Sequence, residues 1–366
     1  MKIAIDIRTA GGEKAGKGWF TFHITQNLLK LDRENEYILY VKDKIAGFEE
    51  FKNAELKQIK GSGFFWHRNV AKNAKKEEVD LFFAPSSYII PALLPKSIKT
   101  ILTIHDLVAF LFPETHNRKA NLIERLFIKK ALKKASHTIT VSENTKKDVQ
   151  ERFKFYKNPI STIYNAADET YKPIAKEKLN DFIKNTNLPK HFFVAVGTLI
   201  PRKNYPNLIK ALTILHKTHP GAHLIIVGGK GWQENEIHDL IKQNYLRKKV
   251  HLLGYLSTTA IRNLYNLARA LVFPSFYEGF GIPPLEAMKS GCPVIASYTS
   301  SIPEVVGDAA LLINPESPEE IATAMKKLIE NTELAESLRN KGLAQAQKFS
   351  WEQSAEKLLE IIEDLK

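Results

Sequence analysis

Short apolar runs that alternate with amphipathic helical patterns constrain the fold of this chain more than any other feature. The first series of strand candidates covers residues 2–7, 37–41, 81–84, 100–104 and 138–141. A second series covers residues 192–196, 222–227, 250–253, 270–273 and 294–296. Helical patterns separate the strands, for example at 20–31, 121–134 and 206–217. Because strands that alternate with helices form parallel sheets, the sequence predicts two Rossmann-like, doubly wound α/β halves.

The length of the chain and its interruptions predict where these halves begin and end. A chain of 366 residues is too long for one ordinary hydrophobic core. We expect a first domain at 1–172, a linker rich in Pro, Asn and charge at 173–190, and a second domain at 191–348. A last amphipathic helix is expected within 349–366. Ligands of open parallel sheets bind beyond the carboxyl ends of the strands, so the site is expected in a central cleft between the halves.

Composition indicates a soluble protein with an anionic partner. The apolar fraction of 44% and the charged fraction of 25% are typical of globular proteins, and no apolar run has the length of a membrane span. The chain starts directly with a strand pattern, and Cys292 is its single cysteine, which excludes an intramolecular disulfide and a cysteine metal cluster. We therefore expect a cytoplasmic location. The net charge of +13 favours nucleic acid, phosphorylated ligands or an acidic membrane as partners.

The run FPSFYEGFGIPPLEAMKSGCPV at residues 273–294 carries the strongest functional signal. An apolar strand is followed by a glycine-rich loop and by a helix that starts at the two prolines and ends at Gly291. Such a loop presents backbone N–H groups that suit a phosphate, and Glu278 and Glu286 add acceptors for hydroxyl groups. Separately, each glutamate also has an ordinary explanation, because Glu286 is favoured near a helix N-terminus and Glu278 could be a plain loop acid.

As a whole, the frame EGFGIPPLE at residues 278–286 resembles the signature of retaining GT-B glycosyltransferases of family 4. The resemblance extends over most of the chain and is densest at 193–312. It implies transfer of a hexose from a nucleoside diphosphate sugar to an acceptor hydroxyl of a glycan or lipid-linked glycan. By the same resemblance Glu278 contacts the sugar hydroxyls, Glu286 the ribose hydroxyls, and the first domain serves the acceptor, with the last helix packing back on it. The loop residues expected at the donor are Gly279, Phe280, Gly281 and Ile282.

A second motif, GTLIPRKN at residues 197–204, follows a strand and precedes a helix. Asn204 is expected to cap that helix, so Arg202 and Lys203 approach a helix N-terminus, although two solvated bases are the ordinary alternative. In the family the matching Arg and Lys bind the donor diphosphate, and Gly197 belongs to the same loop. The residues of this motif most resemble those of the matching motif in bacterial mannosyltransferases. GDP-mannose is therefore the first donor candidate, and UDP-sugars come next.

The chain contains no Asp-x-Asp pair, the motif with which other nucleotide-sugar enzymes hold a divalent cation. Without a cation, positive side chains and helix N-termini must stabilise the leaving diphosphate. We therefore expect a metal-independent reaction with no metal site and no cofactor besides the donor substrate.

Further candidates follow from strand ends. His105 and Asp106 follow a predicted strand, where a lone histidine is more often structural than functional. In the family the corresponding histidine reaches the donor sugar, which makes His105 a catalytic candidate and Asp106 its support. Gly254 and Tyr255 match a family loop that lines the base pocket.

The glycine-rich segment 11–18 offers a competing hypothesis. It satisfies G-x-x-x-x-G-K, the start of a P-loop, and Asp106 could imitate the acid of a nucleotide hydrolase. However, Gly18 stands where Ser or Thr must bind Mg²⁺. The family also has a glycine-rich loop here, which lines the donor phosphates and the acceptor, and Gly12 is therefore a donor-binding candidate.

Two basic amphipathic segments, 118–134 and 63–76, have either an ordinary structural role or a role in docking on an anionic membrane. No RNA- or DNA-binding motif appears, so nucleic acid is not expected as a partner. A non-catalytic polyanion- or membrane-binding protein on the same fold stays open as an alternative. The intact pairs Glu278/Glu286 and Arg202/Lys203 favour the enzyme.

Overall fold

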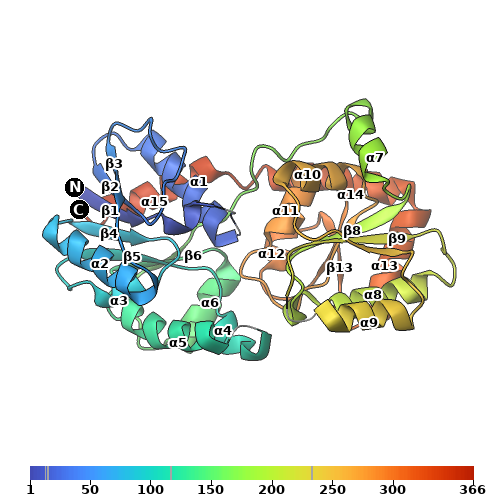
Figure 1. The fold of residues 1–366 in the computed structure, drawn as a ribbon, viewed down its shortest axis with the longest axis horizontal. Coiled ribbons are helices and arrows are strands. Elements are labelled where there is room, and N and C mark those ends of the chain that lie inside the picture. The colour runs from blue at the N-terminus through green and yellow to red at the C-terminus, as the bar shows by residue number, and fades with distance from the viewer. Residues whose placement is uncertain (13, 15, 116–117, 232–233) are drawn as a thin grey trace. The chain divides into compact units, whose positions relative to one another are not determined.

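The computed structural model describes residues 1–12, 14, 16–115, 118–231 and 234–366. The chain forms two compact units. The first consists of Met1–Asn165 and Ser350–Lys366, and the second of Ala166–Phe349. Each unit contains one parallel sheet with helices on both faces, as Figure 1 shows. The predicted pair of doubly wound α/β halves is therefore confirmed.

The first unit contains a seven-stranded sheet with the order β3-β2-β1-β4-β5-β6-β7. Its strands are β1 (Lys2–Asp6), β2 (Glu36–Val41), β3 (Ala54–Gln58), β4 (Leu81–Ala84), β5 (Lys99–Ile104), β6 (His137–Thr140) and β7 (Ile160–Thr162). Every neighbouring pair is parallel. The two outermost strands were not expected from the sequence, because each is short and polar and pairs on one side only.

Helices cover both faces of this sheet. The helices α2 (Gly63–Lys76), α3 (Ile89–Leu93), α5 (Arg118–Leu132) and α6 (Glu143–Arg152) share one buried apolar cluster with the strands. On the other face, α1 (Gly16–Leu31) packs with α15 (Trp351–Glu363) from the end of the chain (Figure 1). The Trp351 ring stacks on His23 with centroids 5.1 Å apart, and Ser354 Oγ donates to the Tyr164 carbonyl at 2.7 Å. The last helix thus belongs to the first unit.

The second unit contains a six-stranded sheet with the order β10-β9-β8-β11-β12-β13. Its strands are β8 (Phe192–Val196), β9 (His223–Val227), β10 (Val250–Leu252), β11 (Leu271–Phe273), β12 (Val294–Ser297) and β13 (Ala310–Ile313). One face packs on α8 (Tyr205–Leu215), α9 (Glu234–Gln243) and α13 (Pro318–Glu330). The remaining helices of this unit are α7 (Asn180–Thr186), α10 (Thr258–Leu267), α11 (Ile282–Lys289), α12 (Ile302–Val306) and α14 (Thr332–Ala346). The segment expected as a linker contains α7 and lies in this unit.

Strand order reverses at one place in each sheet, between β1 and β4 and between β8 and β11. At such a switch point the loops that leave neighbouring strands turn to opposite faces, which leaves space for a ligand at the carboxyl edge. The loops after β8 and β11 carry the two motifs that the sequence singled out. No helix in the described parts of the chain is both long and apolar enough to span a membrane.

Asn204 differs from its expected role as a side-chain cap of α8. It occupies the N-cap position, but its backbone is left-handed with φ of 59° and its side chain makes no cap bond. Instead, its Nδ2 donates to the carbonyls of Pro274 at 3.0 Å and Pro315 at 2.5 Å. The buried amide therefore joins the loops that follow β8, β11 and β13, because its two N–H groups satisfy two buried acceptors.

We expect Asn204→Asp to destabilise the second unit by about 2–4 kcal/mol, since a carboxylate donates to neither carbonyl and would be buried beside both. Asn204→Gly keeps the left-handed backbone without strain and loses only the two hydrogen bonds, so a smaller loss of about 1–3 kcal/mol is expected. Scanning calorimetry of both variants tests this order. An Asp variant as stable as the natural chain would contradict the role of the amide as a donor.

Candidate active site

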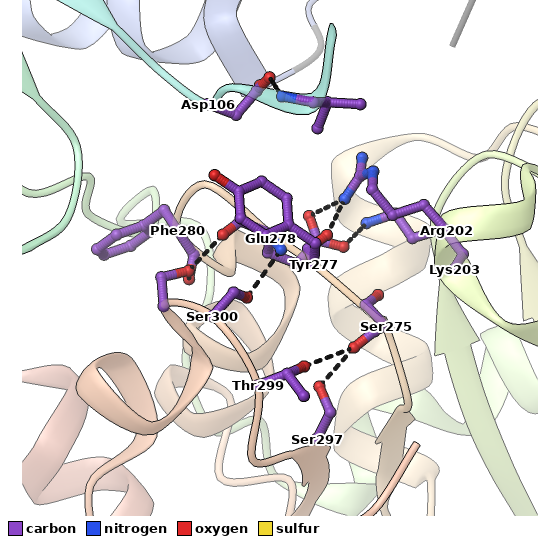
Figure 2. A network of polar contacts seen from close by, with 12 residues as sticks. Asp106, Arg202, Lys203, Ser275, Tyr277, Glu278, Phe280, Ser297, Thr299 and Ser300 are labelled. Atoms are coloured by element: carbon purple, nitrogen blue, oxygen red, sulfur yellow. Dashed lines mark hydrogen bonds and ion pairs between the residues drawn. The ribbon is translucent and has the colours of Figure 1, made fainter. Parts of the chain in front are cut away.

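Three charged side chains meet at the carboxyl edge of the second sheet (Figure 2). Arg202 Nη1 lies 2.8 Å from Glu278 Oε2, and Lys203 Nζ lies 2.6 Å from Glu278 Oε1. Each carboxylate oxygen therefore has its own cation. The Glu278 residue is only 9% exposed, so the three groups form an ion-pair cluster that is largely removed from water.

The loops after β8 and β11 bring these residues together. Arg202 and Lys203 lie in a single 3-10 turn, Pro201–Lys203, and Glu278 lies 75 residues after Lys203 in the chain. Phe276 N donates to the Arg202 carbonyl at 2.9 Å, and Arg202 Nη1 donates to the Tyr277 carbonyl at 2.5 Å. Lys203 Nζ also lies 4.6 Å from the centre of the Phe273 ring. The cluster is thus held by backbone contacts as well as by charge.

Hydroxyl groups at and after the end of β12 support the same loop, and sequence reasoning missed them. The Glu278 N–H donates to Ser300 Oγ at 2.9 Å, and Ser301 Oγ lies 2.9 Å from the Glu278 carbonyl and 2.6 Å from the Phe280 carbonyl. Below them, Ser297 and Thr299 donate to the Ser275 carbonyl (Figure 2). The available signal was the hydroxyl-rich run SYTSS at the end of β12, a strand that neighbours β11.

The electrostatics of the cluster keep Glu278 ionised. Burial by itself would raise the pKa of Glu278, but the charges of Arg202 and Lys203 outweigh it and bring the pKa to about 2. Burial also lowers the pKa of Lys203, an effect that the Glu278 charge opposes. Two cations share one anion, so the cluster has an excess positive charge at a place where water is largely excluded.

The loop that follows Glu278 ends in a tight turn. Gly281 is the N-cap of α11 with φ of 118°, and a side chain there would lie 2.9 Å from Ile302 Cδ1. Phe280 is buried, with its ring 5.7 Å from that of Phe349. Pro283 and Pro284 have no backbone N–H group. Among the first three residues of α11, Ile282 is therefore the one that has a backbone N–H group to donate.

Glu286, in the middle of α11, has a different environment from Glu278. Its Oε2 lies 3.4 Å from the Tyr265 hydroxyl, and Tyr171 also hydrogen-bonds to it. Burial raises the pKa of Glu286 to about 7, although the two tyrosine hydroxyls lower it in part. The negative charge of Asp168 adds to the rise, so this carboxyl changes charge near neutral pH. The two tyrosines were not predicted from the sequence.

Other predicted donor residues lie along the same edge of this sheet. Gly197 directly follows β8 and lies close to the Lys203 side chain, and its carbonyl accepts from the Tyr205 hydroxyl at 2.6 Å. Gly254 follows β10, and its carbonyl accepts from the Gly228 N–H at 2.8 Å. Tyr255 is exposed. All these groups face the carboxyl edge, so the second unit alone presents most of the predicted donor residues.

In the first unit, His105 follows β5 and is 7% exposed. Its ring packs edge-on against Phe20, and Nε2 lies 2.7 Å from the Pro85 carbonyl. Because a carbonyl only accepts, Nε2 carries the proton and Nδ1 is an acceptor. Burial lowers the pKa of His105 to about 4, so the ring is neutral at pH 7. Asp106 Oδ2 lies 3.9 Å from Lys17 Nζ, and its Oδ1 accepts from the Val108 N–H.

Comparisons with known proteins agree with this geometry. The Glycosyltransferase Family 4 model matches residues 47–171, and the model for glycosyl transferases group 1 matches residues 176–345. O-antigen chain mannosyltransferase B of Escherichia coli is 30% identical over 76% of this chain and 73% of its own length. This chain belongs to the GT-B glycosyltransferases of family 4.

A second relative is also a mannosyltransferase by name, and two solved structures resemble this chain over its full length. The O-antigen chain mannosyltransferase RfbU of Salmonella typhimurium is 32% identical over 66% of this chain and 63% of its own. Sucrose-phosphate synthase from Thermosynechococcus elongatus has a TM-score of 0.81 at 18% identity, covering 100% of this chain and 98% of that one. Anabaena HepE in complex with UDP and glucose has a TM-score of 0.79 at 22% identity, with both chains fully covered. Because both identities are low, the two structures show that this chain has the same GT-B fold as they have.

The local geometry of this glycosyltransferase argues against a P-loop in the segment 11–18. A side chain at Gly18 would lie 2.5 Å from the Thr9 carbonyl oxygen, so the position does not accept the Ser or Thr that a P-loop requires. Gly12 is exposed with φ of 63°, while Glu13 and Ala15 of the same segment lie outside the described residues. The role of Gly12 at a donor stays a prediction.

Glu286→Gln should make the stability of the glycosyltransferase less dependent on pH between 5 and 8. The folded-state pKa of about 7 exceeds the ordinary 4.5, so the natural chain loses stability as the pH rises from 4.5 through 7. An uncharged Gln avoids this loss, which we expect to be about 1–3 kcal/mol. Thermal unfolding at pH 5 and pH 8.5 measures it. Parallel pH profiles for the variant and the natural chain would show that Glu286 is not held in its neutral form.

Proposed function

We propose that this glycosyltransferase transfers a mannosyl group, with retention of anomeric configuration, from a nucleoside diphosphate sugar to an acceptor hydroxyl. GDP-mannose is the first donor candidate and UDP-sugars the second. The acceptor is a glycan or a lipid-linked glycan in the synthesis of a bacterial surface polysaccharide. The names of the O-antigen mannosyltransferases among the relatives support the sugar and the pathway class. The buried cluster of Arg202, Lys203 and Glu278 supports the chemistry.

The excess positive charge of that cluster is the observation on which the proposal rests. When the bond between the sugar C1 and the diphosphate oxygen breaks, negative charge grows on the diphosphate. Arg202 and Lys203 stand at the carboxyl edge of the sheet, where their N–H groups donate to that oxygen as it leaves. These two side chains take the part that a divalent cation has in other enzymes, so we propose a metal-independent transfer.

Glu278 acts as a positioning group for the sugar in this proposal. Its carboxylate is ionised at neutral pH and accepts hydrogen bonds from sugar hydroxyls. A carboxylate with a cation on each oxygen is a poor nucleophile, which disfavours a covalent intermediate at this residue. Retention then follows from attack on the face that the diphosphate leaves, with a diphosphate oxygen taking the proton of the acceptor hydroxyl. The contacts of Glu286 with ribose and of His105 with the sugar stay predictions.

Charge variants separate the binding of the diphosphate from the positioning of the sugar. In the triple variant Arg202→Met, Lys203→Met, Glu278→Gln no charge is left buried without a partner. We expect its Kd for GDP to rise about 100-fold or more, because two charge-assisted bonds are lost at about 1.5–3 kcal/mol each. Glu278→Gln alone should bind GDP at least as tightly as the natural chain, because a competing carboxylate is gone, and should lose about 100-fold in transfer rate.

Titration calorimetry with GDP and UDP, together with a thermal melt of each variant, provides these values. If the triple variant is folded and binds both nucleotides as tightly as the natural chain, the proposal that Arg202 and Lys203 bind the diphosphate is wrong. Full transfer by Glu278→Gln would remove the carboxylate from sugar positioning.

A donor screen tests the reaction itself. We expect nucleotide release to be fastest with GDP-mannose, the product to have the anomeric configuration of the donor by NMR, and the rate to persist in EDTA. An inverted product would contradict retention. An absolute requirement for a divalent cation would contradict the assignment of the leaving-group charge to Arg202 and Lys203.

A further inference from the structure

The second sheet has a groove at its amino edge, which is the edge opposite to the candidate active site. His191 and Phe192 line this groove at the start of β8. Arg269 lines it just before β11, and Pro293 directly before β12. Because these strands are parallel, their amino ends lie together and away from the loops that follow β8 and β11. The groove has a volume of about 730 Å³, a size typical of small-molecule sites. We call it the amino-edge groove.

Two further segments of the second unit form its walls. One wall is the 3-10 turn Lys176–Leu179, and the other is the start of α14, where the lining residues recur at 332, 335, 336 and 339. This spacing places them on one face of the helix. Asn266 holds the segment before the 3-10 turn, since its Oδ1 accepts from the Ile174 N–H at 2.7 Å. The groove is therefore built by one compact unit and needs nothing from the first.

The charges that line the amino-edge groove are strongly unbalanced. Its bases are Lys176, Lys190, Arg269 and Arg339, and its acid is Glu336. Within the described ranges of the chain, the side chains of these four bases form no ion pair and no hydrogen bond with the protein. Four positive charges therefore face one negative charge, and their N–H groups are available to a ligand.

The two arginines are attached to the rigid part of the unit. Arg269 is half-buried, and its backbone N–H donates to the Phe192 carbonyl at 2.8 Å, which fixes its position beside β8. The Arg339 side chain lies along the end of α11, because a Cβ at Gly291 would lie 3.6 Å from its Nη1. Its charge also opposes the rise that burial causes in the pKa of Cys292. Planar guanidinium groups held in this way suit the paired oxygens of a phosphate.

We propose that the amino-edge groove binds a small molecule that carries two phosphate groups. A phosphate monoester has a charge of about −1.5 to −2 at pH 7 and three acceptor oxygens, so two of them balance the four bases. A carboxylate brings a single charge and fewer acceptors per group, and it matches the groove less well. This site is separate from the proposed diphosphate site at Arg202 and Lys203, and the inference needs neither a sugar donor nor an acceptor.

Titration calorimetry with fructose 1,6-bisphosphate as the probe tests the proposal. We expect one molecule to bind per chain, with a Kd that rises with salt because the contacts are between charges. Citrate, which has a similar size but carries carboxylates, should bind about 10-fold more weakly or less.

Two variants of the amino-edge groove locate the binding. Arg269→Gln with Arg339→Gln should raise the Kd for fructose 1,6-bisphosphate about 10-fold or more, because two charge-assisted contacts are lost. Lys176→Gln with Lys190→Gln changes exposed residues, so it tests the site even if the arginine variant is unstable. This lysine variant should also raise the Kd, by about 3-fold or more. Both variants should bind GDP as the natural chain does, and a thermal melt of each shows that it is folded.

Lys242→Gln with Arg247→Gln is the matched control. It removes the same charge from exposed residues of the second unit that do not line the groove, and it should leave the Kd for fructose 1,6-bisphosphate unchanged.

Absence of saturable binding by the natural chain would overturn the proposal, as would an equal rise of the Kd in the control. Tighter binding of citrate would overturn the choice of phosphate. A folded groove variant that loses GDP and fructose 1,6-bisphosphate together would show that both bind at one place. Failure of the donor screen would leave all these outcomes unchanged, so the two proposals fail separately.

Discussion

The pairing of buried Glu278 with Arg202 and Lys203 is the interaction on which the second unit's site depends. Removal of a carboxylate from water is costly, and here a cation on each oxygen offsets the cost and brings the pKa to about 2. The same bonds orient both cations at the end of the sheet. The cluster therefore holds the loops after β8 and β11 in one arrangement and leaves an excess of positive charge at the proposed diphosphate site.

The topology of the sheet makes this meeting possible. Residues 202 and 278 are far apart in sequence, but β8 and β11 are neighbours at the point where the strand order reverses. The loops that follow these strands lie at the same edge of the sheet. Asn204 and the hydroxyl group of Ser300 hold these loops in place by hydrogen bonds. The charged groups thus rest on buried polar contacts rather than on mobile surface loops.

Much of the fold was predictable because interior strands are apolar and helices are amphipathic. Strands such as β4 and β8 occupy the predicted positions. The helix α11 begins at Ile282, one residue before the two prolines at which it was expected to start, and it ends before Gly291. The edge strands β3 and β7 were missed, since each pairs on one side only and lacks a continuous apolar run. The edge strand β13 was missed as well, although its four residues are apolar. Asn204 was placed correctly but given the wrong role, because the partners of its side chain lie 70 and 111 residues away.

The sequence by itself determined the alternation of strands and helices, the two motif loops and the family, because these depend on residues that are near one another in the chain. Only the tertiary structure decided that Glu278 is bound by Arg202 and Lys203, while Glu286 is held by Tyr171 and Tyr265 and has a pKa near 7. The physical reason is that burial and charge pairing come from residues brought together across the sheet. Two glutamates with seven residues between them in one motif therefore have opposite pKa shifts.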